Sequence, residues 1–272
     1  MSIRSPEALA PHSKRQAREA ELRHSVTADS NQVAAGEDWF AEYGIRHVAI
    51  IPDGNRRWAK QHQVPTEVGH ATGLLRVLPE LVSKLCEAGV HTVTVWGFST
   101  ENWTREATEV NHLMEISAQF LCNQVMDIAR RHQARVYHLG RKDRLFPKVI
   151  DALDNAEKTT VENREHVYNV ALDYGGQDEL TRAAARMGRA VQQGADASSV
   201  SLADFLDTAG QPHAQPDLVI RSSGEHRMSG FLPLQTTYSE LFFVDEMFPD
   251  FSFGLLRSVA EQFKWRKRRF GG

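Results

Sequence analysis

The chain has 272 residues, of which 41% are hydrophobic and 25% are charged, and its formal net charge at pH 7 is −3. These values are ordinary for a soluble globular protein, and they exclude a general attraction to nucleic acid or anionic membranes, so any anion site must be local. No apolar run reaches membrane-spanning length, and the N-terminus lacks the apolar core of a signal peptide; we therefore expect a cytoplasmic protein without a transmembrane segment.

Residues 1–45 are polar and rich in alanine, and we interpret them as an extension that precedes one domain at 46–272. The two cysteines, Cys86 and Cys122, lie in segments that are expected to be helical. At such positions a small buried side chain is commoner than a disulfide or a metal ligand.

Six short runs of β-branched and apolar residues follow, and they are too continuous for half-exposed antiparallel strands, which alternate. Amphipathic helical stretches separate them. Strands that alternate with helices predict a single α/β domain, with a mainly parallel six-stranded sheet covered by helices on both faces. The predicted strands are 47–51, 92–98, 134–140, 166–172, 217–222 and 240–244, and the predicted helices are 69–88, 105–131, 147–163, 177–193 and 252–268.

The first polar cluster, "PDGNRR" at 52–57, directly follows the first strand. A turn that leads into a helix would explain it. Against that reading, the free N–H groups of a helix start at Gly54 and Asn55 favour an anion, and arginine forks suit phosphate oxygens. An acid among these cations, Asp53, fits a ligand of Mg²⁺ shared with a phosphate, since Mg²⁺ usually takes one or two carboxylates plus phosphate oxygens.

Three more polar features are expected near the same sheet edge, where open parallel sheets bind ligands. "RSSGEHRMSG" at 221–230 is either a solvated loop or a second phosphate pocket. "STENWTR" at 99–105 supplies Asn102 and Arg105, although Thr100 or Asn102 could instead cap the next helix. His70 opens the second helix, where a basic group is not favoured, which indicates a nearby anion. The motifs of P-loop nucleotidases, dinucleotide-binding folds and zinc metalloproteases are absent.

Five motifs in this order, over about residues 45–272, resemble the cis-prenyltransferases, or undecaprenyl diphosphate synthase family. They are "HVAIIPDGNRRWAK", "GHATG", "VTVWGFSTENWTR", "DYGGQDEL" and "PDLVIRSSGEHRMSGF", with "RRFGG" at the C-terminus. The resemblance implies a homodimer with a shared active site, in which two helices beside the sheet enclose an apolar tunnel for an isoprenoid tail.

The resemblance also implies a role for each matching residue. Asp53 would bind Mg²⁺, Glu240 would act near the metal partly across the dimer interface, and Asn102 and Arg105 would assist ionisation and proton loss. The allylic diphosphate would be held by Gly54, Asn55, Arg56, Arg57, Trp58 and His70, and the diphosphate of the five-carbon acceptor by Arg221, Arg227, Ser229, Arg269 and Gly271.

The chain departs from the family pattern at several positions. Thr66 replaces a common arginine, the "NYGGR" pattern begins with Asp173 and ends with Gln177, and Pro233 interrupts the usual "SNFLLWQ". The resemblance implies head-to-tail condensation with isopentenyl diphosphate and a short product. Pro233 lies in a stretch that is also similar to irregular synthases, which join two five-carbon units head-to-middle with dimethylallyl diphosphate. A third hypothesis is that the chain is a non-catalytic partner subunit. The retention of Asp53, Arg57, Arg221 and Arg227 argues against it.

Overall fold

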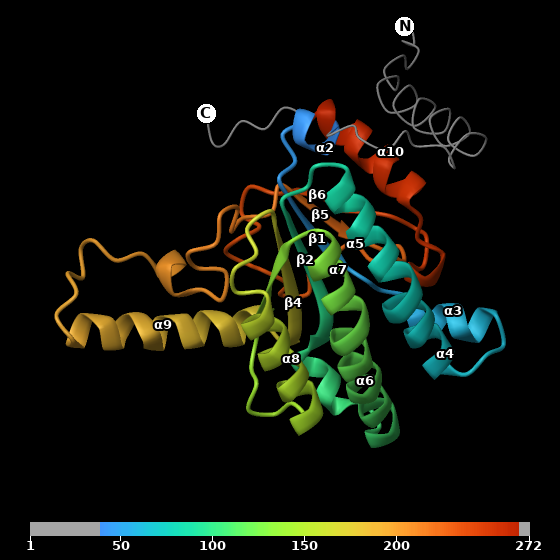
Figure 1. Cartoon of the computed structure of the whole chain (residues 1–272), viewed down its shortest axis with the longest axis horizontal. Coiled ribbons are helices and arrows are strands. Elements are labelled where there is room, and N and C mark those ends of the chain that lie inside the picture. The colour runs from blue at the N-terminus through green and yellow to red at the C-terminus, as the bar shows by residue number, and fades with distance from the viewer. Residues whose placement is uncertain (1–38, 267–272) are drawn as a thin grey trace, which may run out of the picture.

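Six parallel strands form one sheet in the order β3-β4-β2-β1-β5-β6 (Figure 1) in the computed structural model, which describes residues 39–266. All five strand pairs are parallel, which confirms the predicted six-stranded α/β architecture. The strands are β1 (His47–Ile51), β2 (Thr92–Ser99), β3 (Ala134–Leu139), β4 (His166–Tyr174), β5 (Leu218–Arg221) and β6 (Glu240–Phe243).

Helices cover one face of the sheet and enclose the larger hydrophobic core. The other face is covered mainly by non-helical chain, including Phe231 and Leu232, and by the start of α9, so the expectation that helices cover both faces is met only in part. The far half of α9 projects away from the sheet (Figure 1). The α-helices are α2 (Trp39–Glu42), α3 (Asn55–Gln61), α4 (Thr66–Ala71), α5 (Leu78–Glu87), α6 (Ala107–Phe120), α7 (Met126–Arg131), α8 (Pro147–Thr159), α9 (Gly176–Gln192) and α10 (Phe253–Lys264).

Both long predicted helices contain a π-helical segment. η1 (Thr72–Val77) joins α4 to α5, and η3 (Leu121–Val125) joins α6 to α7. Single π-helical turns inside α-helices are frequent at functional sites, because each one shifts the register of the side chains that follow. Shorter 3₁₀ segments complete the fold at η2 (Thr100–Thr104), η4 (Leu202–Phe205) and η5 (Phe248–Asp250).

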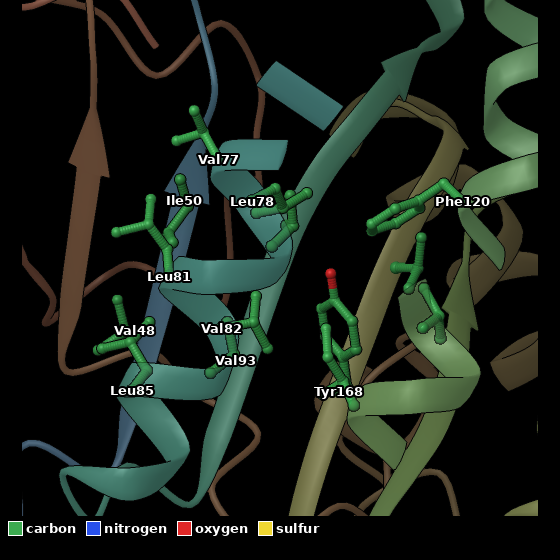
Figure 2. Close-up of a cluster of buried hydrophobic side chains, with 14 of the residues drawn as sticks. Val48, Ile50, Val77, Leu78, Leu81, Val82, Leu85, Val93, Phe120 and Tyr168 are labelled. Carbon is green, nitrogen blue, oxygen red and sulfur yellow. The ribbon is translucent and has the colours of Figure 1, made fainter. Parts of the chain in front are cut away.

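The leucine stripe of α5 anchors that helix on the sheet. Leu78, Leu81 and Leu85 are at most 2% exposed and pack toward Val48 and Ile50 of β1 (Figure 2). Truncating such a leucine to alanine costs about 2–5 kcal/mol. The buried stripe therefore holds α5 against β1.

The packed domain begins earlier than the sequence indicates. Trp39 and Phe40 of α2 and Ile45 are buried in the main core, although they fall within the predicted extension. Residues 1–38 lie outside the described part. Cys86 is buried as predicted, whereas Cys122 is exposed, contrary to the prediction. Among residues 39–266, none of the helices combines the length and apolarity that crossing a membrane would require.

His47, the first residue of β1, is completely buried. One ring nitrogen contacts the carbonyl oxygen of His213 and the other the hydroxyl of Thr94, each at 2.7 Å. Burial lowers the pKa of the imidazole from 6.5 to about 4. His47 is therefore neutral in the folded protein at neutral pH.

We expect the free energy of unfolding to fall as the pH drops from about 6.5 to about 4, because the unfolded chain then protonates His47 while the buried ring resists. The loss at the lower limit is about 3 kcal/mol. Denaturant titrations at neutral pH and at about pH 4.5 would measure it. H47N should reduce this dependence without abolishing it, because the pKa of His70 is lowered as well, and the exposed-site control H62N should leave it unchanged. An equal pH dependence in H47N and wild type would contradict the prediction.

Candidate active site

Asp53 lies in the turn between β1 and α3, at the carboxyl edge of the sheet. Its Oδ1 accepts a hydrogen bond from the Gly54 amide at 2.7 Å, and its Oδ2 accepts one from Arg221 at 2.8 Å. Gly54 has φ of +98°, and a Cβ there would lie 2.6 Å from the Ser223 hydroxyl. The turn that presents Asp53 thus requires glycine.

Arg221 connects this turn to the segment after β5. It pairs with Ile51 in the register of the sheet and is 6% exposed. Its guanidinium donates to Asp53, to the Ser229 hydroxyl at 2.8 Å and to the Arg227 carbonyl. Two segments that are far apart in the sequence are thereby joined by a partly buried charge-assisted contact.

Hydrogen-bonding capacity is left unused around the same turn. Three buried polar atoms have no partner in the described chain: Arg221 Nε, Ser223 Oγ and Asn55 Oδ1. Ser223 is also held at φ +78°. Most buried polar atoms are paired, so their gathering at one turn indicates a place for a polar ligand.

The exposed arginines of this edge are paired with a carboxylate that the sequence did not single out. Arg57 Nη2 lies 3.1 Å from Glu225 Oε1 and 3.9 Å from Asp53 Oδ1, and Arg227 also pairs with Glu225. The Arg57 and Arg227 side chains are 50% and 61% exposed. Exposed ion pairs contribute only about 0–1 kcal/mol, so both arginines can exchange Glu225 for another anion.

A second cation cluster surrounds Glu109 on α6. One carboxylate oxygen of Glu109 lies 2.8 Å from Arg105, 3.3 Å from His70 and 3.8 Å from Arg56. The anion that His70 indicated is therefore a side chain of the same protein. Its only sequence signal is the i, i+4 spacing from Arg105, which favours a charge pair on one helix face.

His70 is neutral in this cluster. Burial and the nearby charge of Arg105 together lower its pKa from 6.5 to about 4, and Glu109 only partly opposes them. The preceding residue, Gly69, lets α4 approach α3 closely, because a Cβ at that position would lie 2.3 Å from the Asn55 carbonyl oxygen. This close packing places His70 beside the cluster. His70 can thus serve as a hydrogen-bonding group but not as a cation at neutral pH.

Other predicted residues are placed elsewhere. Asn102 lies inside η2, and its side-chain oxygen accepts the amide hydrogen of the N-cap residue Ser99 at 3.0 Å, so it completes a capping box but does not cap the following helix α6 as the alternative interpretation expected. Trp58 donates its indole N–H to Asp250 at 2.8 Å and stacks on His62, which gives it structural partners instead of an orientation toward Asp53.

Glu240 does not join Asp53 within one chain. It is the first residue of β6, in register with Leu218, and it accepts a hydrogen bond from Arg266 at 2.8 Å. Because all strands are parallel, this position lies at the opposite edge of the sheet from Asp53. Arg269 and Gly271 fall outside the described residues.

Within residues 39–266, no cluster of three or more histidine, cysteine or carboxylate side chains could hold a metal ion. The metal candidate at this edge is Asp53, whose carboxylate faces solvent in part, at 31% exposure. A single carboxylate fits Mg²⁺ when phosphate oxygens and water complete the coordination, and it does not fit a metal held by protein ligands alone.

Comparison with known proteins agrees with the sequence motifs. Residues 51–271 match the family model of the undecaprenyl diphosphate synthases. An isoprenyl transferase of Streptococcus mutans is 38% identical over 232 residues, which cover 83% of this chain and 92% of the relative. A ditrans,polycis-undecaprenyl-diphosphate synthase of Pseudomonas aeruginosa, (2E,6E)-farnesyl-diphosphate specific, is 42% identical, with 83% and 90% covered.

A solved structure shares the fold. Lavandulyl diphosphate synthase from Lavandula x intermedia, in complex with dimethylallyl diphosphate, superposes with a TM-score of 0.81 at 32% identity, covering 85% of this chain and all of that one. The resemblance drawn from the motifs is confirmed by these matches, and the chain belongs to the undecaprenyl diphosphate synthase family of isoprenyl transferases.

Proposed function

We propose that the protein transfers a prenyl group from an allylic isoprenoid diphosphate to isopentenyl diphosphate, head-to-tail, and releases pyrophosphate. The observation that carries the proposal is the contact between Arg221 and Asp53, which joins two cation-rich segments at neighbouring strand ends. Two diphosphate groups need two sets of donors beside one metal ligand, and this edge of the sheet offers both.

The allylic diphosphate is assigned to the turn after β1 and to the Glu109 cluster. Exposed guanidinium groups of Arg56 and Arg57 are suited to phosphate oxygens. The backbone of Gly54 and Asn55 and the neutral ring of His70 add hydrogen bonds. The acceptor diphosphate is assigned to Arg221, Arg227 and Ser229, with Arg269 and Gly271 retained as predictions.

The chemistry explains why this donor set is useful. Breaking the allylic C–O bond leaves an allylic cation and a pyrophosphate whose negative charge grows. Fixed donors aimed at the leaving group stabilise that charge, typically by about 2.7–4 kcal/mol for each donor. Arg105, paired with Glu109 beside His70, and Asn102 in the adjacent turn are proposed to assist ionisation and the final proton loss.

Mg²⁺ is part of the proposal, with Asp53 as its protein ligand. The bound ion would supply charge neutralisation at the diphosphate. Asp53 itself is held in place by the Gly54 amide and by Arg221, so its carboxylate is oriented before substrate arrives. The backbone of Asp53 is fixed as well, because the Ser222 hydroxyl bonds both its N–H and its carbonyl oxygen at 2.8 Å.

The isoprenoid tail is proposed to run from His70 along the half-buried Leu74 and Leu75 of η1. Apolar walls there would keep water away from the cation. Deeper in the same layer, Tyr168 stands between α5 and the segment that carries Phe120 (Figure 2), and its buried hydroxyl has no partner in the described chain. A bulky ring in this position supports the proposal of a short product.

Head-to-middle condensation with dimethylallyl diphosphate as the acceptor is the second candidate. It is favoured by the similarity to the lavandulyl diphosphate synthase structure and by Pro233, which packs closely on Gly176 at the start of α9. The higher identity to the Pseudomonas aeruginosa undecaprenyl-diphosphate synthase supports head-to-tail coupling instead. A non-catalytic partner subunit is not favoured, because the Asp53 and Arg221 pair is intact.

Product analysis should separate the two reactions. Purified protein with Mg²⁺ and geranyl or dimethylallyl diphosphate is expected to form a longer prenyl diphosphate only when isopentenyl diphosphate is present. Mass spectrometry and NMR would identify the product and its linkage. Product from dimethylallyl diphosphate alone would support head-to-middle coupling, and a correctly folded chain inactive with every donor would support the accessory role.

Replacing Asp53 should abolish turnover without unfolding the protein. We expect D53N to lower kcat by about 10³-fold, because the metal ligand and the oriented charge beside the leaving group are both lost. Arg221 would keep a neutral acceptor, so circular dichroism at room temperature should remain that of the wild type, while the melting temperature should fall because the buried guanidinium loses its anion. D143N, at an exposed carboxylate paired with Arg141, is the matched control and should be fully active; near-normal turnover of D53N would contradict the assignment.

Glu240 can reach Asp53 only from a second copy of the chain, so its predicted role requires a homodimer. We expect E240Q and D53N homodimers to be inactive, and co-refolded mixtures to recover up to about a quarter of wild-type turnover by random pairing of half-sites. Activity of the mixtures at several ratios, with size determined by light scattering, would measure this. Mixed dimers without recovery would show that each site is complete within one chain.

A further inference from the structure

Asp173 is a fully buried carboxylate in an unusual backbone position near the carboxyl end of β4. Phe98 of β2 pairs with Leu172, and Ser99 pairs with Tyr174, so Asp173 is an extra residue that the ladder skips. Its φ is +49°, in the left-handed region that asparagine and aspartate tolerate better than other side chains. Such bulges re-aim a side chain and are common next to active sites.

The carboxylate of Asp173 ties two loops together. Its Oδ1 accepts the indole N–H of Trp103 at 2.8 Å, and its Oδ2 accepts Nε–H of Arg144 at 2.9 Å. A second nitrogen of the Arg144 guanidinium also donates to Oδ1. The central carbon of this guanidinium lies 5.8 Å from the centre of the Trp103 ring. Phe98 packs edge-on against the same ring at 5.1 Å. The indole is thus held on three sides.

Trp103 belongs to η2, which also carries Asn102 and directly precedes Arg105. No residue of η2 is fully buried, and only the ring of Trp103 packs against the main core, so core packing alone restrains this short 3₁₀ turn weakly. Its local restraints are the capping box between Ser99 and Asn102 and two hydrogen bonds within the turn, which the Arg105 amide donates to the Asn102 carbonyl and the Thr104 hydroxyl to the Glu101 carbonyl. Short 3₁₀ segments have poor hydrogen-bond geometry and depend on their surroundings. The contact with Asp173 supplies the long-range restraint.

We propose that Asp173 is a positioning residue, whose buried carboxylate fixes Trp103 and thereby sets where Asn102 and Arg105 stand relative to the diphosphate site. The inference rests on the proposed prenyl transfer. Asp173 needs no contact with substrate for this role. Displacing a reacting group by about 1 Å can cost about 10²-fold in rate, so loss of the restraint should lower kcat more than it weakens binding.

Variants at both ends of the contact separate positioning from stability. D173G removes the carboxylate and relieves the positive φ. W103F removes the indole donor and part of the ring but keeps an aromatic face for Phe98 and Arg144. D173N keeps both the backbone tolerance and an oxygen acceptor for Trp103. We expect D173G and W103F each to lower kcat about tenfold with KM for both substrates within about twofold. D173N should retain most of the activity, and the double variant W103F/D173G should be no slower than D173G.

A matched control is D207N, which weakens another largely buried carboxylate; Asp207 pairs with Arg182 and Arg186 and, among residues 39–266, makes no hydrogen bond or ion pair with η2. It should lower the melting temperature and leave kcat within about twofold. The indole N–H resonance of Trp103 is assigned by its absence in W103F, among five tryptophans. It should shift in D173G and stay near its wild-type position in D207N.

The outcomes are distinct. Unchanged kcat in D173G, or losses that multiply in the double variant, would overturn the positioning role. If D173G does not fold, W103F and the indole resonance in D173N decide the question, and a fully active W103F would overturn it. A folded wild type without any prenyl transfer would instead overturn the proposed function, and with it this inference.

Discussion

The contact between Arg221 and Asp53 is the constraint on which the rest of the site depends. Parallel pairing of β1 with β5 puts both residues at one edge of the sheet, where Arg221 is almost fully buried. A buried guanidinium without an anion would be strongly unfavourable, so the turn that carries Asp53 is held against β5 by electrostatics as well as by the sheet. The Gly54 turn, the Ser222 bonds and the start of α3 all follow from this alignment.

The sheet could be predicted from the sequence because it depends on local and repeating signals. The run at 47–51 is continuous and apolar because β1 is buried on both faces between β2 and β5. The π-helical turns of η1 and η3 could not be predicted, since the Leu78 to Leu85 spacing is the same with or without them. The buried α2 was also missed, because four helical residues after a polar stretch carry no periodicity.

The candidate site was predicted less completely, and the reason is electrostatic. Arginines, glycines and a lone acid after a strand are visible in the sequence. The carboxylates that face them are not, because Glu109 and Glu225 come into contact with Arg56 and Arg57 only through the fold. Glu240 shows the converse limit. Its type fits a metal site, but its place at the start of β6 separates it from Asp53 within one chain.

The carboxylates paired with the arginines of both clusters must be displaced before another anion can bind there. Three arginines face Asp53 and Glu225 at the first cluster, and two arginines with a neutral histidine face Glu109 at the second. Binding is therefore an exchange of one anion for another, and its net free energy is much smaller than the sum of the phosphate contacts. A singly charged anion would gain little over a carboxylate. A diphosphate offers more charge and more acceptors than any one carboxylate, so the resting ion pairs themselves favour a multiply charged anion at this edge of the sheet.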